Sequence, residues 1–315
     1  MVEQLKDIPF FRDWKTIQPI HLGWSKDKKY YIEDKQNRRL LLRTADISVF
    51  EQKKKEFAFI QKLNAYSFEM SQAITMGTCN GGQTVYLLLS WVEGVSLESS
   101  LKKLPESEQY ALGLQAGKIL KEIHAIPVDV QDLPLTDRKQ YKLEQLARYE
   151  KSNIRVENDS AAIDYVYQNI HRLNPLPPVY NHGDFHAGNL IYTPGGQVGV
   201  IDFNRFSCGD RYEDFYKIPI FDAETSIPFS IGEIDGCFDG HPTEQFWSVL
   251  AVYVAHAALF SIKWSEQFGA DEVLEMQERC RRIFADYDNF RTVIPRWYTD
   301  SYAGDCGLCG AGSAG

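Results

Sequence analysis

The chain has 315 residues, of which 44% are hydrophobic and 24% charged, as in an ordinary soluble globular protein. This length is enough for two domains or lobes, each with its own core. The net charge of −9 makes the protein a poor partner for nucleic acid. The longest apolar stretch, the 12 residues from Val249 to Phe260, is shorter than the roughly 20 that cross a membrane. A buried helix and no membrane partner are therefore expected.

The charge is distributed unevenly along the chain. Residues 1–90 hold 14 Lys and Arg against 10 Asp and Glu, a balance of +4, which leaves 20 against 33, or −13, for the remainder. This asymmetry suggests a basic first lobe that binds an anion and an acidic second lobe that binds a cation. Solvated helix faces would produce the same counts.

The first part of the chain predicts a small β-rich lobe. Residues 17–34 form a strand–turn–strand pattern, and residues 40–43 form a short buried strand. Apolar residues at helical spacing predict a helix over 47–63, and residues 84–92 predict an apolar strand. The lobe is expected to cover residues 1–92, with the nucleotide-binding part of the protein and a hinge at its end.

The remainder predicts a larger, mainly helical lobe over residues 93–300. Helices are expected at 110–126, twice within 138–173, and beyond Pro242, and two short strands flank the turn TPGGQ. Residues 301–315 are expected to be a flexible Gly/Ala/Ser-rich tail. The tail holds the pair Cys306 and Cys309, but zinc takes about four ligands and no second pair exists. The six scattered cysteines, without a secretory signal, predict reduced thiols and a cytoplasmic location.

The segment NHGDFHAGNLI, residues 181–191, concentrates the chemistry. Its two histidines raise the possibility of a metal cluster or of a nucleophile with its base. Its Asp184 and Asn189, however, are followed by Asp202 in the apolar stretch VIDF, 18 residues after Asp184. Phosphoryl transfer uses such a carboxylate–amide pair for Mg²⁺ and a further carboxylate for the attacking hydroxyl.

Together these residues resemble the aminoglycoside phosphotransferase and choline-kinase branch of the protein-kinase-like fold. HGDFHAGN followed by IDF is the specific part of the resemblance, and a weaker match extends from about residue 17 to residue 290. The resemblance implies an α+β, bilobal fold with a small β-rich N-terminal lobe and a larger helical C-terminal lobe. It implies that Asp184 is the catalytic base and that Asn189 and Asp202 bind Mg²⁺.

The resemblance also assigns the nucleotide site, with ATP as the expected donor and GTP not excluded. Arg43 falls where protein kinases keep a lysine, and Glu56 would tether it, although Glu56 could instead be a solvated helix residue. The phosphate turn and the hinge that contacts adenine would be formed by two short segments: Gly23 and Ser25, and Ser90, Trp91 and Val92.

Several nearby residues are expected to support the site rather than react. His182 and His186 would buttress the loop, although His186 could be a metal ligand, and Asp214 would stabilise the loop or cap a helix. His256, in an apolar helix, is expected to be a hydrogen-bonded core residue.

Two features favour a small-molecule kinase over a protein kinase. The chain places 57 residues between His124 and His182, where protein kinases have about ten, and it leaves no room for a long activation segment after Asp202. The segment 210–244 holds nine acids against two bases. These acids suggest a small cationic substrate, an amine-bearing compound such as an aminoglycoside or amino sugar, although they could simply be solvated. The substrate residues predicted here are Asp210, Glu233, Asp235, Asp239 and Trp247.

Other functions stay open at this point. Choline, macrolides or another metabolic alcohol could be the acceptor, because this fold serves many substrates. A nucleotide-binding pseudokinase is the alternative from another class, but it would need none of Asp184, Asn189 and Asp202. Sequence gives no oligomeric state and no proof of a role in antibiotic resistance.

Overall fold

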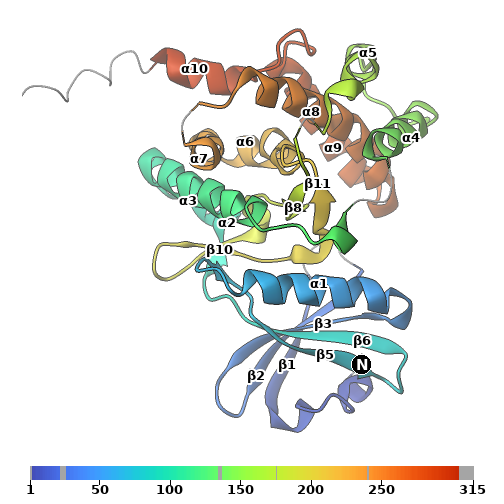
Figure 1. Ribbon diagram of the computed structural model, residues 1–315, viewed down its shortest axis with the longest axis vertical. Helices are drawn as coiled ribbons and strands as arrows, with labels where there is room; N and C mark the ends of the chain where they lie inside the picture. The colour runs from blue at the N-terminus through green and yellow to red at the C-terminus, as the bar shows by residue number, and fades with distance from the viewer. Residues whose placement is uncertain (1, 22–25, 134–136, 175, 240, 305–315) are drawn as a thin grey trace, which may run out of the picture. The chain divides into compact units, whose positions relative to one another are not determined.

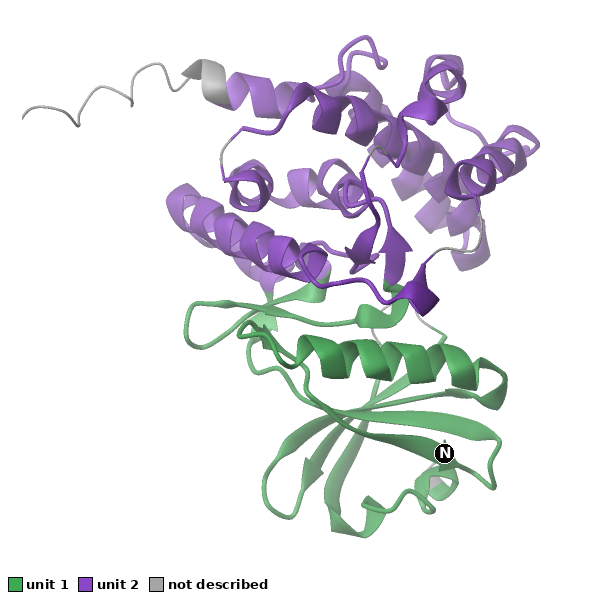
Figure 2. Cartoon of the chain, in the orientation of Figure 1, with its two compact units in different colours: residues 1–96, 189–206 green, residues 97–188, 207–315 purple. Residues whose placement is uncertain are grey.

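A computed structural model describes residues 2–21, 26–133, 137–174, 176–239 and 241–304 (Figure 1). Its contacts divide the chain into two compact units (Figure 2): unit 1 is Met1–Ser96 with Asn189–Phe206, and unit 2 is Leu97–Gly188 with Ser207–Gly315. Unit 1 thus ends four residues after the predicted boundary at residue 92. It also includes the segment with Asn189 and Asp202, which the sequence had placed in the C-terminal lobe. The reason is strand pairing, as described below.

Unit 1 is built on a five-stranded antiparallel sheet with the order β1-β2-β3-β6-β5. Its strands are β1 (Trp14–Ile20), β2 (Lys28–Asp34), β3 (Arg39–Asp46), β5 (Ala73–Cys79) and β6 (Thr84–Ser90). Pro19 lies in the edge strand β1, where a missing N–H costs least. The sequence did not predict β5, because this other edge strand is half exposed and lacks a regular apolar alternation.

Each face of this sheet is covered. On one face the side chains of Ile32, Leu42, Tyr86 and Leu88 join a buried cluster to which Leu5, from the N-terminal 3-10 turn η1 (Val2–Leu5), also belongs. Successive strand residues point to opposite faces. Helix α1 (Phe50–Leu63) packs against β5 and β6 and lies within the predicted helix 47–63. The remaining 3-10 turns of unit 1 are η2 (Phe11–Asp13), η3 (Ile47–Val49) and η7 (Phe203–Arg205).

A second, small sheet of unit 1 brings the segment after residue 188 into this unit. Its order is β4-β10-β9-β7, with β4 (Glu69–Met70), β10 (Val198–Val200), β9 (Leu190–Tyr192) and β7 (Val95–Ser96). The hairpin β9–β10 pairs with β4 on one side and with β7 on the other. Gly94 has φ +137° and lies so close to the Tyr192 carbonyl that a side chain at this position would collide with it.

Unit 2 is mainly helical. Its α-helices are α2 (Leu97–Leu101), α3 (Glu106–His124), α4 (Arg138–Glu150), α5 (Ser160–Asn169), α6 (Ala223–Thr225), α7 (Ile227–Phe238), α8 (Glu244–Ser265), α9 (Ala270–Asp286) and α10 (Arg296–Gly304). The 3-10 turns are η4 (Val130–Asp132), η5 (Ile170–Arg172), η8 (Asp214–Tyr216) and η10 (Glu266–Phe268), η9 (Ile218–Asp222) is a π-helix, and η6 (Ala187–Asn189) lies where the chain passes to unit 1. Strands β8 (Val179–Asn181) and β11 (Ser207–Gly209) pair antiparallel. Helix α10 continues to Gly304, so residues 301–304 of the predicted flexible tail are helical.

Helices α3 and α7 lie side by side (Figure 1) and approach each other through glycines on both. A side chain at Gly113 or Gly117 would collide with the carbonyls of Phe229 or Glu233 on α7. Gly232 is equally close to α3. The two helices therefore meet backbone to backbone, which the sequence analysis did not anticipate.

Helix α8 contains the apolar stretch that the sequence predicted as a buried helix. By length and composition alone it could cross a membrane, but 72% of its apolar window is buried inside unit 2. His256 lies on this helix, 3% exposed, with Nε2 3.0 Å from the Lys142 carbonyl oxygen. Burial lowers the pKa of His256 to about 3, so it is a neutral, hydrogen-bonded core residue as expected.

Candidate active site

The two predicted magnesium ligands stand at the open end of one hairpin in unit 1. Asn189 directly precedes β9 and Asp202 follows β10 by two residues. The Ile201 N–H donates to the Asn189 carbonyl at 3.1 Å, which continues the ladder beyond the Val200–Leu190 pair. Asp202 itself is left-handed, with φ +66°, a conformation that a non-glycine residue adopts at a cost. Hairpin pairing thus brings an amide and a carboxylate 13 residues apart in the sequence to neighbouring backbone positions.

Arg43, on β3, lies at the centre of a buried ionic cluster in unit 1. Its guanidinium is 2.6 Å from Glu56 Oε1 and 3.3 Å from Asp202 Oδ1, and its Nε donates to Asp27 Oδ2 at 3.0 Å. The ion pair between Arg43 and Glu56 is therefore formed, and Glu56 is a buried residue, 1% exposed, rather than a solvated one. Burial by itself lowers the pKa of Arg43, but Glu56, Asp202 and Asp27 outweigh it and raise that pKa above its ordinary value.

Two lysines complete this cluster and were not predicted from the sequence. Lys53, one helical turn before Glu56 on α1, lies 2.6 Å from Asp27 and 2.8 Å from Glu56. Lys29, on β2, lies 2.9 Å from Asp202 Oδ2. The spacing of Lys53 and Glu56 was a usable signal, since residues three apart share a helix face. No such signal exists in the sequence for Lys29, because its partner Asp202 is 173 positions away.

The predicted hinge follows directly from β6. The Ser90 N–H donates to the Gln72 carbonyl at 2.9 Å and the Trp91 N–H to the Arg39 carbonyl at 3.0 Å. Val92 has no backbone hydrogen bond within the described ranges of the chain. Gly23 and Ser25, the predicted phosphate turn, lie outside the described residues.

In unit 2 the loop that carries Asp184 is held by the carboxylate of Asp214. Its Oδ1 accepts from the Gly183 N–H at 2.7 Å, and its Oδ2 accepts from the His182 N–H at 3.1 Å. His124 Nε2, at the end of α3, is 2.9 Å from the same Oδ2, and Asn181 Nδ2 donates to it at 3.3 Å. Asp214 is 3% exposed, so it works as a buried acceptor for the loop backbone and not as a reacting group.

The two histidines of the loop act as acceptors for its backbone. The Asp184 N–H donates to His182 Nδ1, and the Gly188 N–H donates to His186 Nδ1, each at 3.2 Å. No group of three or more His, Cys, Asp or Glu able to hold a metal occurs among the described residues. The geometry thus places both histidines in loop support, and it does not gather the ligands that a zinc site at His186 would need.

Asp184 has a close cationic partner that the sequence did not reveal. Lys217 Nζ lies 2.6 Å from Asp184 Oδ1, and His186 Nε2 is 3.8 Å from the same oxygen. Lys217 is 6% exposed. It was one of only two bases in the acidic segment 210–244, which is the one signal that could have drawn attention to it.

A model of the phosphotransferase enzyme family matches residues 16–247. The chain belongs to this family. An aminoglycoside 3'-phosphotransferase of Escherichia coli is 28% identical over 137 residues, 41% of this chain and 49% of that protein, and one of Salmonella typhimurium matches equally. The chain thus spans about half the length of the curated relatives it matches.

Solved structures of aminoglycoside phosphotransferases share the fold. The GDP complex of an aminoglycoside 2'-phosphotransferase has a TM-score of 0.70 at 16% identity, covering 91% of this chain and 96% of that one. A ternary complex of a thermostable mutant of another such enzyme, with ADP and hygromycin B, has a TM-score of 0.62 at 16% identity and covers 86% and 93%. The predicted protein-kinase-like α+β fold is confirmed.

The five substrate residues predicted from the sequence do not form one surface. Asp210 is 2% exposed and accepts hydrogen bonds from the Asn174 N–H, the Tyr212 N–H and the Tyr253 hydroxyl. Glu233 is 1% exposed and Trp247 is 3% exposed, so these two side chains also belong to the interior. Their assignment as substrate contacts was wrong, because a count of acids along the chain does not separate buried from solvated ones.

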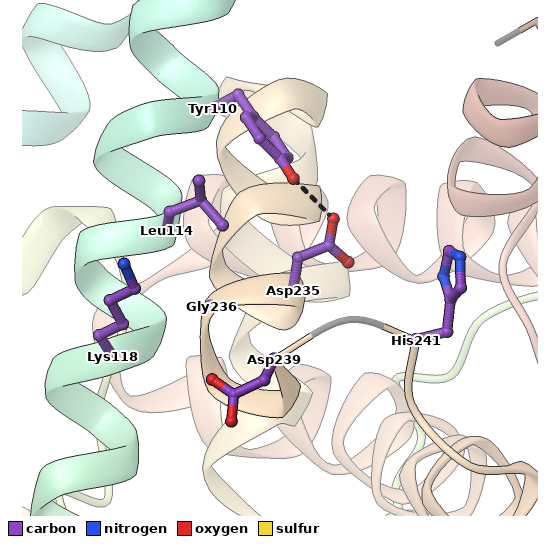
Figure 3. Close-up of a pocket in the computed structure, with 7 residues that line it drawn as sticks. All are labelled: Tyr110, Leu114, Lys118, Asp235, Gly236, Asp239 and His241. Atoms are coloured by element: carbon purple, nitrogen blue, oxygen red, sulfur yellow. Dashed lines mark hydrogen bonds between the residues drawn. The ribbon is translucent and has the colours of Figure 1, made fainter. Parts of the chain in front are cut away.

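The other two, Asp235 and Asp239, line a cavity of about 370 Å³ in unit 2 (Figure 3). The Asp235 carboxylate accepts from the hydroxyls of Tyr110 and Tyr298, at 3.0 and 3.1 Å, and Asp239 pairs with Lys121. The remaining lining residues are Leu114, Lys118, Gly236 and His241. Cations stand beside the acids here, so the cavity is of mixed charge and not a purely acidic cleft.

Proposed function

We propose that this member of the phosphotransferase family is a kinase that transfers the γ-phosphoryl group of ATP to a hydroxyl group of an aminoglycoside or a related amino sugar. The observation that carries the proposal is the hairpin end at which Asn189 and Asp202 meet. An amide and a carboxylate held side by side there, with Asp184 on the preceding loop, supply the groups that phosphoryl transfer uses.

In the proposed reaction the Asp184 carboxylate orients the acceptor hydroxyl and takes its proton. The hydroxyl oxygen forms a bond to the γ-phosphorus while the bond from that phosphorus to the bridging oxygen breaks. The electron pair of the broken bond leaves with ADP, and the phosphorylated acceptor is the second product. The protein forms no covalent bond to the phosphoryl group in this reaction, so positioning and charge account for most of the rate enhancement.

The residues present fit a magnesium ion. Mg²⁺ prefers hard oxygen ligands and is commonly held by one or two protein groups together with substrate phosphates. Asn189 and Asp202 offer an amide oxygen and a carboxylate of that kind. With Mg²⁺ bound, the ion would neutralise charge on the phosphates. Asp202 also pairs with Lys29 and Arg43.

The nucleotide contacts are inferred from the same unit. Arg43 and Lys53 supply cations for the phosphates, and Glu56 holds both in place. Of the hinge residues, Ser90 and Trp91 already use their N–H groups, so we assign the adenine contact to the Val92 N–H. ATP is the donor we propose; because one structural relative was solved with GDP, GTP is tested beside it.

The acceptor is inferred from the relatives, two of which carry the name aminoglycoside 3'-phosphotransferase. The test is a release assay for ADP and GDP with Mg²⁺, run over aminoglycosides, amino sugars, choline and macrolides. We expect nucleotide turnover with an aminoglycoside or amino sugar and its loss in Asp184→Asn. Asp164→Asn, an exposed aspartate on α5, is the matched control and should turn over normally. Turnover only with choline or a macrolide would overturn the acceptor assignment, and full turnover by Asp184→Asn would overturn the base.

A further inference from the structure

The ammonium of Lys217 contacts the carboxylate of Asp184, the expected catalytic base. The Nζ–Oδ1 distance to Asp184 is 2.6 Å, and both partners are largely withdrawn from solvent, with side chains 7% and 16% exposed. A charge-assisted hydrogen bond of this length is strong and directional, and it is screened less than an exposed pair.

The backbone that carries Lys217 has an unusual shape. Residues Ile218–Asp222 form a single π-helical turn, a rare conformation that often occurs at functional sites. The hydrogen bonds of a π-helix join residues five apart, and this geometry brings Lys217 and Asp222 to a common side of the segment. Both indeed reach the catalytic loop: Lys217 binds Asp184, and Asp222 Oδ1 accepts from the Ala187 N–H at 2.8 Å.

The surroundings fix the ammonium of Lys217 in place. It lies 5.1 Å from the ring centroids of both Tyr216 and Phe221, within the range of a cation–π contact. Asp222, on the same segment, is 1% exposed, and burial raises its pKa well above its ordinary value, although the Ala187 N–H and the charge of Lys217 act against this shift.

We propose that Lys217 is a positioning residue for phosphoryl transfer: it holds the Asp184 carboxylate through Oδ1 and balances its charge while the acceptor hydroxyl is aligned. This role rests on the proposed function, because it presumes that Asp184 is the base. A carboxylate fixed through one oxygen has its second oxygen fixed as well, so its orientation does not have to be acquired at each turnover. The cation comes from a segment 33 residues after Asp184, since the loop HGDFHAGN itself contains no lysine or arginine.

The test compares Lys217→Met, Lys217→Arg and Lys142→Met with the wild-type protein. Lys142 is the matched control, because it is also 6% exposed and also paired with a carboxylate, Glu213, at 2.9 Å. Steady-state kinetics with Mg·ATP and the best acceptor are measured beside thermal unfolding. We expect Lys217→Met to lower kcat roughly 10- to 100-fold, the usual effect of losing a group that orients another, with each KM changed less than about 3-fold.

Lys217→Arg keeps the cation and should recover most of the lost kcat, whereas Lys142→Met should unfold at a lower temperature and keep the wild-type kcat per folded molecule. If Lys217→Met retains kcat within about 2-fold, or if the Arg and Met variants lose the same amount, the positioning role is wrong while the kinase itself stands. If the wild-type protein phosphorylates no acceptor, the proposed function fails and this role fails with it. The Asp184→Asn variant distinguishes these two outcomes. If the wild-type protein is active and Asp184→Asn is not, the proposed function stands, and an unaffected Lys217→Met variant then refutes only the positioning role.

Discussion

The ionic cluster of unit 1 and the backbone of the Asp184 loop in unit 2 are held by different means. In unit 1, Arg43, Lys53 and Lys29 are bound by the carboxylates of Glu56, Asp27 and Asp202, side chain to side chain. In unit 2, the carboxylates of Asp214 and Asp222 bind backbone N–H groups of the loop that carries Asp184.

This difference follows from what each region has to do. Ion pairs between side chains can exchange partners; under the proposed function, the cluster in unit 1 releases cations to the phosphates and a carboxylate to Mg²⁺. Backbone N–H groups have no other partner in a buried loop, so the loop in unit 2 keeps one shape. Under the proposed function, the charges of unit 1 that change partners are paired with one another, whereas the backbone of the Asp184 loop is tied down by buried carboxylates.

The largest expected effect comes from Asp214→Ala, which removes the acceptor of the catalytic loop. The N–H groups of His182 and Gly183, and His124, would lose a buried partner, and we expect the free energy of unfolding to fall by about 3–5 kcal/mol. Denaturant unfolding measures this change. Exposed Asp164→Ala is the control and should change stability by less than about 0.5 kcal/mol. Equal stability of the two variants would show that the loop does not depend on Asp214.

Arg43→Met breaks the cluster of unit 1 and should cost less. Glu56 and Asp27 lose one buried cation, but Lys53 remains at 2.8 and 2.6 Å from them, so we expect a loss of about 3 kcal/mol, the lower end for a broken buried pair. The KM for ATP should also rise, because a phosphate contact is lost, while kcat changes less. An unchanged KM for ATP would remove Arg43 from the nucleotide site and contradict the idea that its ion pairs exchange with phosphate.

The smallest expected effect is that of Gly117→Ala, at the contact between helices α3 and α7. The new methyl group would collide with the Glu233 carbonyl, and overpacking costs about 1–3 kcal/mol, of which alanine regains about 1 kcal/mol as a better helix former. We expect a net loss of about 1–2 kcal/mol in thermal or denaturant unfolding. Gly195→Ala is the control, since its nearest neighbouring atom is 3.9 Å away. A stable Gly117→Ala variant would mean that α3 and α7 can separate without cost.

The sequence predicted those parts of the molecule that depend on local pattern. The strands at residues 28–34 and 84–90 and the helices at 106–124 and 244–265 follow from apolar periodicity. The sequence did not predict the edge strand β5, which is half exposed, or helix α7, which contains two glycines and is buried at every position from Phe229 to Gly236.

Candidate site residues could be named from the sequence where a motif marks them and not where the fold alone brings them together. Asp184, Asn189 and Asp202 stand in a recognisable pattern. Lys217 lies 33 positions from Asp184, and Lys29 lies 173 from Asp202, so only the folded chain reveals these pairs. Asp210 and Trp247 failed as substrate residues for the opposite reason: their residue types suited the function, but tertiary packing had used them for the core.

The most direct test of the central claim is the mass of an aminoglycoside after incubation with the protein, Mg²⁺ and ATP. The product should be heavier by one phosphoryl group, it should form together with an equal amount of ADP, and it should be absent with Asp184→Asn. An unmodified aminoglycoside after prolonged incubation with folded, nucleotide-binding protein would contradict the proposed function. So would a phosphorylated product made equally well by the Asp184→Asn variant.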